Sequence, residues 1–258
     1  MSAFIEVTMG ELLRNTTQRF PDNDALIYPD TGLKQNYTEF LRTCEAVAKG
    51  FMAIGVKNGD HVSVWTTNVP EWVYMQFGLG MIGAVLVTVN TNYKTSELEY
   101  ILNQSDSTTL VLIEEYRDTN FYDTAREVIP ELDTCAPGKL TSRKLMHLKN
   151  VVYIGSREKT PGMFSFKELI ELGTSISDKD LKEREQEVDY HDVVNMQYTS
   201  GTTGFPKGVM LTHYNVINNA RMVGDVMGMT QDDRLLIQVP LFHCFGCVMS
   251  SLNCVVHG

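Results

Sequence analysis

The sequence lacks an excess of basic residues and any apolar run long enough to span a membrane. Its 258 residues contain 22 Lys and Arg against 32 Asp and Glu, a formal net charge of −10. Because this net charge repels phosphate, we expect no nucleic-acid partner. The longest apolar stretch, residues 73–89, is interrupted by Gln76 and falls short of the roughly 20 residues that cross a bilayer. We therefore expect no transmembrane segment.

Cysteine is scarce, and a secretory start is missing as well. The 5 cysteines are an odd number in a chain too large to need disulfides for its stability. Residues 1–30 carry Glu6, Glu11, Asp22 and Asp24 in place of a basic segment followed by an apolar core. These features favour a reduced, cytoplasmic protein, located in the cytosol or in an organelle matrix.

The residues that are present favour an α/β fold with a large core. Hydrophobic residues make up 43% of the chain and charged residues 21%. Apolar runs at 61–65, 84–89 and 108–113 predict buried strands, and helices that begin with Thr38 and Ser96 as N-caps alternate with them. This rhythm is typical of parallel or mixed sheets flanked by helices. The glycines of residues 73–89 predict close packing of a helix on the sheet.

The pattern is less regular between residues 137 and 192, where we expect a surface excursion. After it come a buried-strand pattern at 193–198, a glycine-rich loop, a short strand, and a helix capped by Thr212. The last residues, 250–258, continue an apolar pattern without a polar tail, so we expect a truncated chain.

The glycine-rich loop, Tyr198–Gly208, carries the clearest chemistry. It combines three glycines, four hydroxyl side chains and Lys207. Backbone N–H groups exposed by tight turns, together with a lysine charge, form a site suited to phosphate. The kinase-type phosphate loop does not fit, because Gly208 stands where that motif requires a Ser or Thr after the lysine. An ordinary polar surface loop is the alternative interpretation.

The loop and several flanking segments resemble the adenylate-forming acyl-CoA synthetases, relatives of luciferases and of peptide-synthetase adenylation domains. Similar segments lie at residues 68–72, 83–93, 97–98 and 240–246. The resemblance covers most of the chain. It implies a two-step ligase in which a carboxylate such as a fatty acid attacks ATP to give acyl-adenylate and pyrophosphate, and CoA then displaces AMP. ATP, Mg²⁺ and CoA are the implied cofactors and co-substrates.

Site residues follow from this resemblance. His243 corresponds to a residue beside the acyl pocket; the alternative is a histidine packed next to Phe242 and Phe245. The phosphates of ATP would be held by Thr199, Ser200, Gly201, Thr202, Thr203, Gly204, Phe205, Pro206 and Lys207.

The resemblance also implies that residues 1–258 are an incomplete N-terminal AMP-binding domain, the first part of the family's large domain. The adenine and ribose motifs, the acidic magnesium ligand and the lysine of the C-terminal lid domain do not occur before Gly258. We therefore expect no complete catalytic site here, and we expect the isolated chain to be inactive and to self-associate. Two alternatives remain: a ligase with another acyl acceptor, such as a carrier-protein phosphopantetheine, and a non-catalytic nucleotide-binding module.

Four thiol and imidazole groups near the C-terminus have a spacing typical of zinc sites. They are Cys244 and Cys247, then Cys254 and His257, each pair separated by two residues. The residues between them are mostly apolar, and free cysteine is among the most buried residue types. We therefore expect packing here and no metal site.

Overall fold

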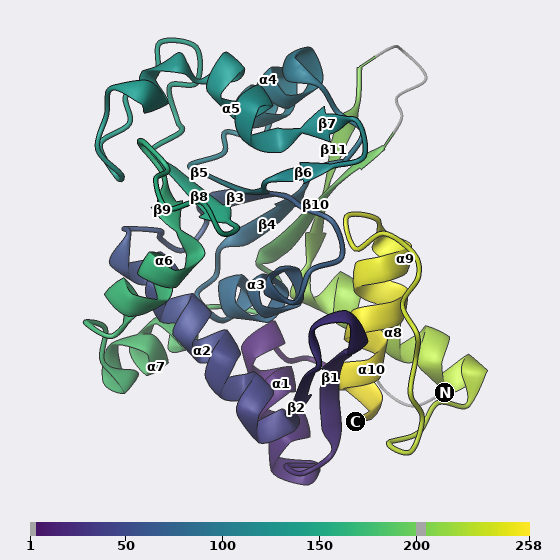
Figure 1. Cartoon of the computed structure of the whole chain (residues 1–258). Coiled ribbons are helices and arrows are strands. Elements are labelled where there is room, and N and C mark those ends of the chain that lie inside the picture. The colour runs from purple at the N-terminus through teal and green to yellow at the C-terminus, as the bar shows by residue number, and fades with distance from the viewer. Residues whose placement is uncertain (1–3, 200–204) are drawn as a thin grey trace.

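A computed structural model describes residues 4–199 and 205–258. The strands are β1 (Asp24–Tyr28), β2 (Leu33–Asn36), β3 (His61–Trp65), β4 (Val85–Thr88), β5 (Thr109–Ile113), β6 (Glu115–Tyr116), β7 (Thr119–Asn120), β8 (Asn150–Ile154), β9 (Phe164–Ser165), β10 (Val193–Thr199) and β11 (Lys207–Thr212). Seven of them form one sheet in the order β11-β10-β4-β3-β5-β8-β9 (Figure 1). Only the β10–β11 pair in this sheet is antiparallel. The predicted α/β fold with a parallel or mixed sheet is confirmed, and the sheet is mainly parallel.

Helices cover both faces of the sheet. They are α1 (Met9–Arg19), α2 (Tyr37–Ala53), α3 (Pro70–Met81), α4 (Thr95–Gln104), α5 (Phe121–Val128), α6 (Phe166–Gly173), α7 (Asp178–Gln186), α8 (His213–Met227), α9 (Cys244–Gly246) and α10 (Asn253–His257). A π-helical turn (Cys247–Leu252) joins α9 to α10. Figure 1 shows α4 and α5 on one face and α2, α3 and α6 on the other.

Alternating side chains of the buried strands supply two separate cores. Val111 of β5 packs in the core that contains α2 and α3, whereas Leu110 and Leu112 pack in the core that contains α4 and α5. This alternation follows from the two-residue period of a strand. Because both faces are covered, nearly every residue of β3, β4 and β5 is apolar or buried, as parallel strands require.

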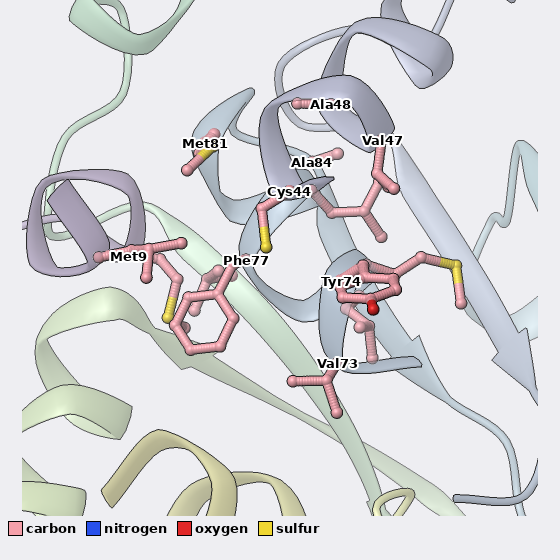
Figure 2. Close-up of a cluster of buried hydrophobic side chains, with 14 of the residues drawn as sticks. Met9, Cys44, Val47, Ala48, Val73, Tyr74, Phe77, Met81 and Ala84 are labelled. Atoms are coloured by element: carbon pink, nitrogen blue, oxygen red, sulfur yellow. The ribbon is translucent and has the colours of Figure 1, made fainter. Parts of the chain in front are cut away.

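The glycines of α3 serve helix–helix contacts that the sequence did not predict. A Cβ atom at Gly78 would lie 2.9 Å from the carbonyl oxygen of Cys44 in α2, and one at Gly80 would lie 2.8 Å from Cβ of Met9 in α1. Figure 2 shows Met9, Cys44 and the neighbouring apolar side chains around this junction. The prediction that these glycines allow close packing on the sheet is therefore only part of the explanation. Gly78 and Gly80 mainly allow α1 and α2 to approach α3 closely.

The structure corrects two predicted helix caps. Asn36, not Thr38, caps α2, and its side chain accepts a hydrogen bond from the Glu39 backbone N–H. Helix α4 begins after Lys94, two residues before the predicted Ser96 cap, and the Glu97 carboxylate accepts a hydrogen bond from the Lys94 backbone N–H. Each true N-cap precedes a glutamate by three residues, a pattern that several nearby polar residues could also satisfy.

The expected surface excursion over residues 137–192 is wrong for part of its length. Within it, β8 pairs with β5 in parallel over the whole of Asn150–Ile154, and its residues 150–153 are buried. Its apolar run, residues 151–154, is only four residues long and is flanked by polar segments, so the local sequence gives a weak strand signal. Helix α7, by contrast, is charge-rich and mostly exposed, in agreement with the expected surface excursion.

The two ends of the chain lie side by side. Thr16 of α1 donates a 2.8 Å hydrogen bond to the carbonyl oxygen of Val255 in α10. The Met9 backbone N–H donates to Nδ1 of His213 at 2.9 Å, at the start of α8. Helix α1 is therefore held by residues more than 200 positions later in the chain.

Within the two described ranges, every helix is too short or too polar to traverse a lipid bilayer. Helix α3, which contains the first part of the apolar stretch at residues 73–89, has 12 residues, and its Trp72 is fully buried in the protein core.

Candidate functional site

The glycine-rich loop joins the two antiparallel strands at the edge of the sheet. In the register of β10 and β11, Thr199 lies opposite Lys207 and Tyr198 lies opposite Gly208. Both Thr199 and Lys207 are exposed. The hairpin thus brings together the first and last of the predicted phosphate-binding residues. Ser200, Gly201, Thr202, Thr203 and Gly204 lie outside the described residues.

Helix α4 holds the base of this loop. The Tyr100 hydroxyl donates a 3.1 Å hydrogen bond to the carbonyl oxygen of Pro206, and the Tyr100 ring lies 5.2 Å from the ring of Phe205, centroid to centroid. The Tyr198 hydroxyl donates to the Gln104 side-chain oxygen, and burial raises the pKa of Tyr198. These contacts fix the backbone on both sides of the loop, so α4 is part of the site.

Sequence reasoning missed Tyr100 and Gln104. They lie about one turn apart on α4, and their partners stand some 100 positions later in the chain. Their i, i+4 spacing was the available signal, because it places both side chains on one face of a helix. That signal alone does not say which element the face meets.

A buried polar row leads along β10 toward the loop. Gln197 donates from Nε2 to the side-chain oxygen of Asn195 at 2.7 Å and to the Cys247 sulfur at 3.3 Å. Asn195 in turn donates to the carbonyl oxygen of Leu86 in β4 at 3.3 Å. These bonds satisfy polar groups that would otherwise be costly to bury. They also join β10 to the segment that follows His243.

His243 lies in the turn before α9 and is exposed. Its Nδ1 accepts a 3.2 Å hydrogen bond from the backbone N–H of Phe245 and caps the short helix. Phe245 is itself 51% exposed. The exposure of His243 and Phe245 does not fit the alternative interpretation of a histidine packed next to Phe242 and Phe245. The role of His243 beside the acyl pocket stays a prediction.

Asn68 fixes the segment that leads to His243. Its side-chain Nδ2 donates to the carbonyl oxygen of Val239 at 2.9 Å, and its Oδ1 accepts from the backbone N–H of Leu241 at 2.8 Å. One amide thus pairs with both a carbonyl and an N–H of the same irregular segment. This explains structurally why an asparagine stands at the start of the 68–72 motif.

A largely apolar cleft of about 530 Å³ lies beside this segment. Leu26 of β1, Phe40 of α2, Val73 of α3 and Leu236 and Leu241 of the passing segment contribute to its lining. Neither Lys207 nor His243 is among the lining residues. Among the described residues, the cleft is thus separate from both ends of the predicted phosphate loop.

Two of the four groups with zinc-type spacing have other partners. The Cys247 sulfur accepts the Gln197 hydrogen bond, and His257 contacts the Asn253 carbonyl oxygen through Nδ1 and the Asp225 carboxylate through Nε2. Across the described ranges, no three His, Cys, Asp or Glu side chains gather in a way that could hold a metal ion. We assign no metal ligand in this part of the chain.

Comparison with known proteins gives relatives over nearly the whole chain. YngI of Bacillus subtilis (strain 168), whose name describes an acyl-CoA synthetase, is 47% identical over 258 residues, which is 100% of this chain and 47% of YngI. The mitochondrial medium-chain acyl-CoA ligase ACSF2 of Danio rerio is 34% identical over 97% of this chain and 41% of its own length. The chain thus spans less than half the length of these relatives.

The crystal structure of a long-chain-fatty-acid-CoA ligase, FadD1 of Archaeoglobus fulgidus, has a similar fold. It superposes with a TM-score of 0.75 and 25% identity over 98% of this chain and 46% of that protein. The sequence model of the AMP-binding enzymes matches residues 13–258. The chain therefore belongs to the AMP-binding enzyme family.

Proposed function

We propose that this chain supplies the ATP phosphate-binding part of an acyl-CoA synthetase. In the complete reaction a carboxylate oxygen attacks the α-phosphorus of ATP, pyrophosphate leaves, and the thiol of CoA then displaces AMP from the acyl-adenylate. The observation that carries the proposal is the hairpin that sets Thr199 opposite Lys207 in a chain of this family. Two relatives named as acyl-CoA synthetase or ligase support the same reaction class.

The proposed role of the loop is to hold the β- and γ-phosphates. Residues Thr199 to Lys207 would surround them, with Lys207 supplying positive charge and the hydroxyl side chains and backbone N–H groups donating hydrogen bonds. Charge builds up on pyrophosphate as it leaves. Donors and cations aimed at that charge lower the activation barrier, because they bind the transition state more strongly than the ground state.

We propose that Mg²⁺ binds together with ATP. We propose no described residue as its ligand. His243 is proposed to border the acyl pocket, since it is exposed at the end of the segment that Asn68 holds. A fatty acid is the proposed carboxylate, because one relative is named as a medium-chain acyl-CoA ligase.

Residues 1–258 are proposed as the N-terminal part of the large domain, with the lid domain elsewhere in the complete protein. The relatives support this division, because this chain matches 47% of one and 41% of another. A cytoplasmic location is also proposed. The five free cysteines are consistent with a reducing compartment.

The deciding experiment measures pyrophosphate release and acyl-CoA formation by the complete protein with ATP, Mg²⁺ and a panel of fatty acids. We expect carboxylate-dependent pyrophosphate release without CoA and acyl-CoA formation when CoA is added. Acyl transfer only to a carrier-protein phosphopantetheine would replace CoA by another acceptor. ATP binding without any pyrophosphate release would indicate a non-catalytic nucleotide-binding module instead.

A further inference from the structure

Two cysteines occupy one helical turn directly after His243. Cys244 is the first residue of α9, and Cys247 follows three positions later. The backbone N–H of Cys247 donates to the His243 carbonyl oxygen at 3.1 Å, which closes the turn. Residues three apart on an α-helix have Cα atoms about 5 Å apart. That separation lies inside the range of roughly 4.4 to 6.8 Å that disulfides span.

The two thiols differ in access. Cys244 is partly exposed, and its sulfur lies 3.8 Å from Nδ1 of His243. Cys247 is 1% exposed, and burial raises the pKa of its thiol to about 12. An accessible thiol three residues before a buried one is the arrangement in which the first attacks an external disulfide and the second resolves the product.

We propose that Cys244 and Cys247 are a reversible thiol–disulfide site whose oxidant is a low-molecular-weight disulfide such as oxidised glutathione. The Cys244 thiol loses its proton to solvent, and the thiolate attacks one sulfur of the small disulfide, which releases one small thiolate. The Cys247 sulfur then attacks the Cys244 sulfur of the mixed disulfide, and its proton passes to the second leaving thiolate. Two protein thiols are oxidised, and one small disulfide is reduced to two thiols.

Cys247 connects this pair to the sheet. Its sulfur accepts from Gln197, which lies two residues before Thr199 in β10, and its carbonyl oxygen accepts a 2.8 Å hydrogen bond from Gln76 in α3. Forming the disulfide turns the Cys247 sulfur toward Cys244 and weakens its contact with Gln197. If the proposed function holds, oxidation therefore changes the link between the phosphate loop and the turn of His243, and it lowers the rate of pyrophosphate release.

The test treats the complete reduced protein with oxidised and reduced glutathione at graded ratios, followed by alkylation and peptide mass spectrometry. We expect a Cys244–Cys247 disulfide that dithiothreitol reverses. Cys247→Ser should stop at a glutathione adduct on Cys244, and Cys244→Ser should form neither product. Cys135→Ser, which changes a partly exposed cysteine elsewhere, is the matched control and should behave like the wild type.

Two results would overturn the proposal: wild-type protein that keeps both thiols, or wild-type protein that accumulates only the glutathione adduct on Cys244. Far-UV circular dichroism shows whether each variant is folded. The oxidation of the wild-type protein tests the proposal even if a variant does not fold. Pyrophosphate release is measured separately on the oxidised and reduced protein. A disulfide that forms in a protein without this activity would refute the proposed function and leave the redox site intact.

Discussion

The Tyr100 hydroxyl of α4 donates a 3.1 Å hydrogen bond to the carbonyl oxygen of Pro206, 106 residues later in the chain. The bond ties a helix on one face of the sheet to the end of the glycine-rich loop. The backbone next to Lys207 is therefore held from outside the hairpin.

Tyr100→Phe removes this hydrogen bond and keeps the ring that packs on Phe205. We expect a loss of about 0.5 to 1.5 kcal/mol in the free energy of unfolding, the usual contribution of one hydrogen bond, and a higher KM for ATP. Urea unfolding and pyrophosphate-release kinetics measure the two effects. Tyr116→Phe, a tyrosine in β6, is the control. An unchanged KM for ATP in Tyr100→Phe would show that this bond does not position the loop.

Lys207→Ala tests the charge at the other side of the loop. Two unit charges 4 Å apart interact by roughly 4 kcal/mol at an effective dielectric constant of 20. Since Lys207 is exposed, solvent reduces that value, and we expect about a tenfold loss in kcat/KM for ATP, or about 1.4 kcal/mol. The melting temperature should not change. Lys159→Ala, at an exposed lysine in the loop between β8 and β9, is the matched control; equal kinetics in both variants would refute the phosphate role.

His213 makes the stability of the fold depend on pH. Burial lowers the pKa of His213 to about 4, although Asp192 and Asp189 oppose this shift. Its Nδ1 accepts the Met9 N–H, and its buried Nε2 has no hydrogen-bond partner among the described residues. The folded state therefore excludes a proton that the unfolded chain binds below its ordinary pKa of about 6.5. The stability that neutral His213 provides is complete above pH 6.5 and is lost as the pH falls toward 4.

Urea unfolding at a series of pH values between 4 and 8 measures this effect. One proton taken up on unfolding changes the free energy of unfolding by about 1.4 kcal/mol per pH unit. In His213→Gln, whose amide oxygen can still accept the Met9 N–H, the slope between pH 4 and 6.5 should be smaller by about that amount. His191→Gln, at an exposed histidine, should keep the wild-type slope. A wild-type slope in His213→Gln would mean that another group titrates.

The segment before His243 presents apolar side chains to solvent. Leu236 is 76% exposed and Leu235 is 37% exposed, beside the apolar cleft. Exposed apolar area of this kind favours association, so we expect the 258-residue chain to self-associate and Leu236→Lys to weaken this association. Sedimentation velocity over a concentration series measures it. Leu172→Lys, on α6 and 42% exposed at present, is the control, and a monomeric wild-type chain would contradict the prediction.

Local patterns predicted much of the architecture and less of the site. The strands at 61–65 and 193–198 were found because buried parallel strands are short apolar runs. Thr212 was found because its capping box precedes a long helix with regular apolar spacing. The strand β8 was missed because its burial comes from pairing with β5, which is decided by topology and not by local sequence.

The site shows the same division. The loop was visible because its composition is unusual for any ordinary connection, and the hairpin that closes it followed from two strands on either side. The anchoring residues Tyr100 and Gln104 were not predicted, since their i, i+4 spacing places them on one helix face but does not say which element that face contacts. These contacts join residues some 100 positions apart. They form only when the strands of the sheet are paired in the correct order, which local sequence does not specify.

The attachment of α1 to His213 and Val255 sets the order in which the protein can fold during synthesis. Met9 leaves the ribosome 204 residues before His213, an interval of roughly 10 to 40 s at 5 to 20 residues per second. Over that time α1 can pack only on α2 and α3, because α8 and α10, which also contact it, have not yet been synthesised. The parallel core of β3, β4 and β5 can assemble first. Part of the apolar face of α1 therefore stays uncovered until α8 and α10 have been synthesised.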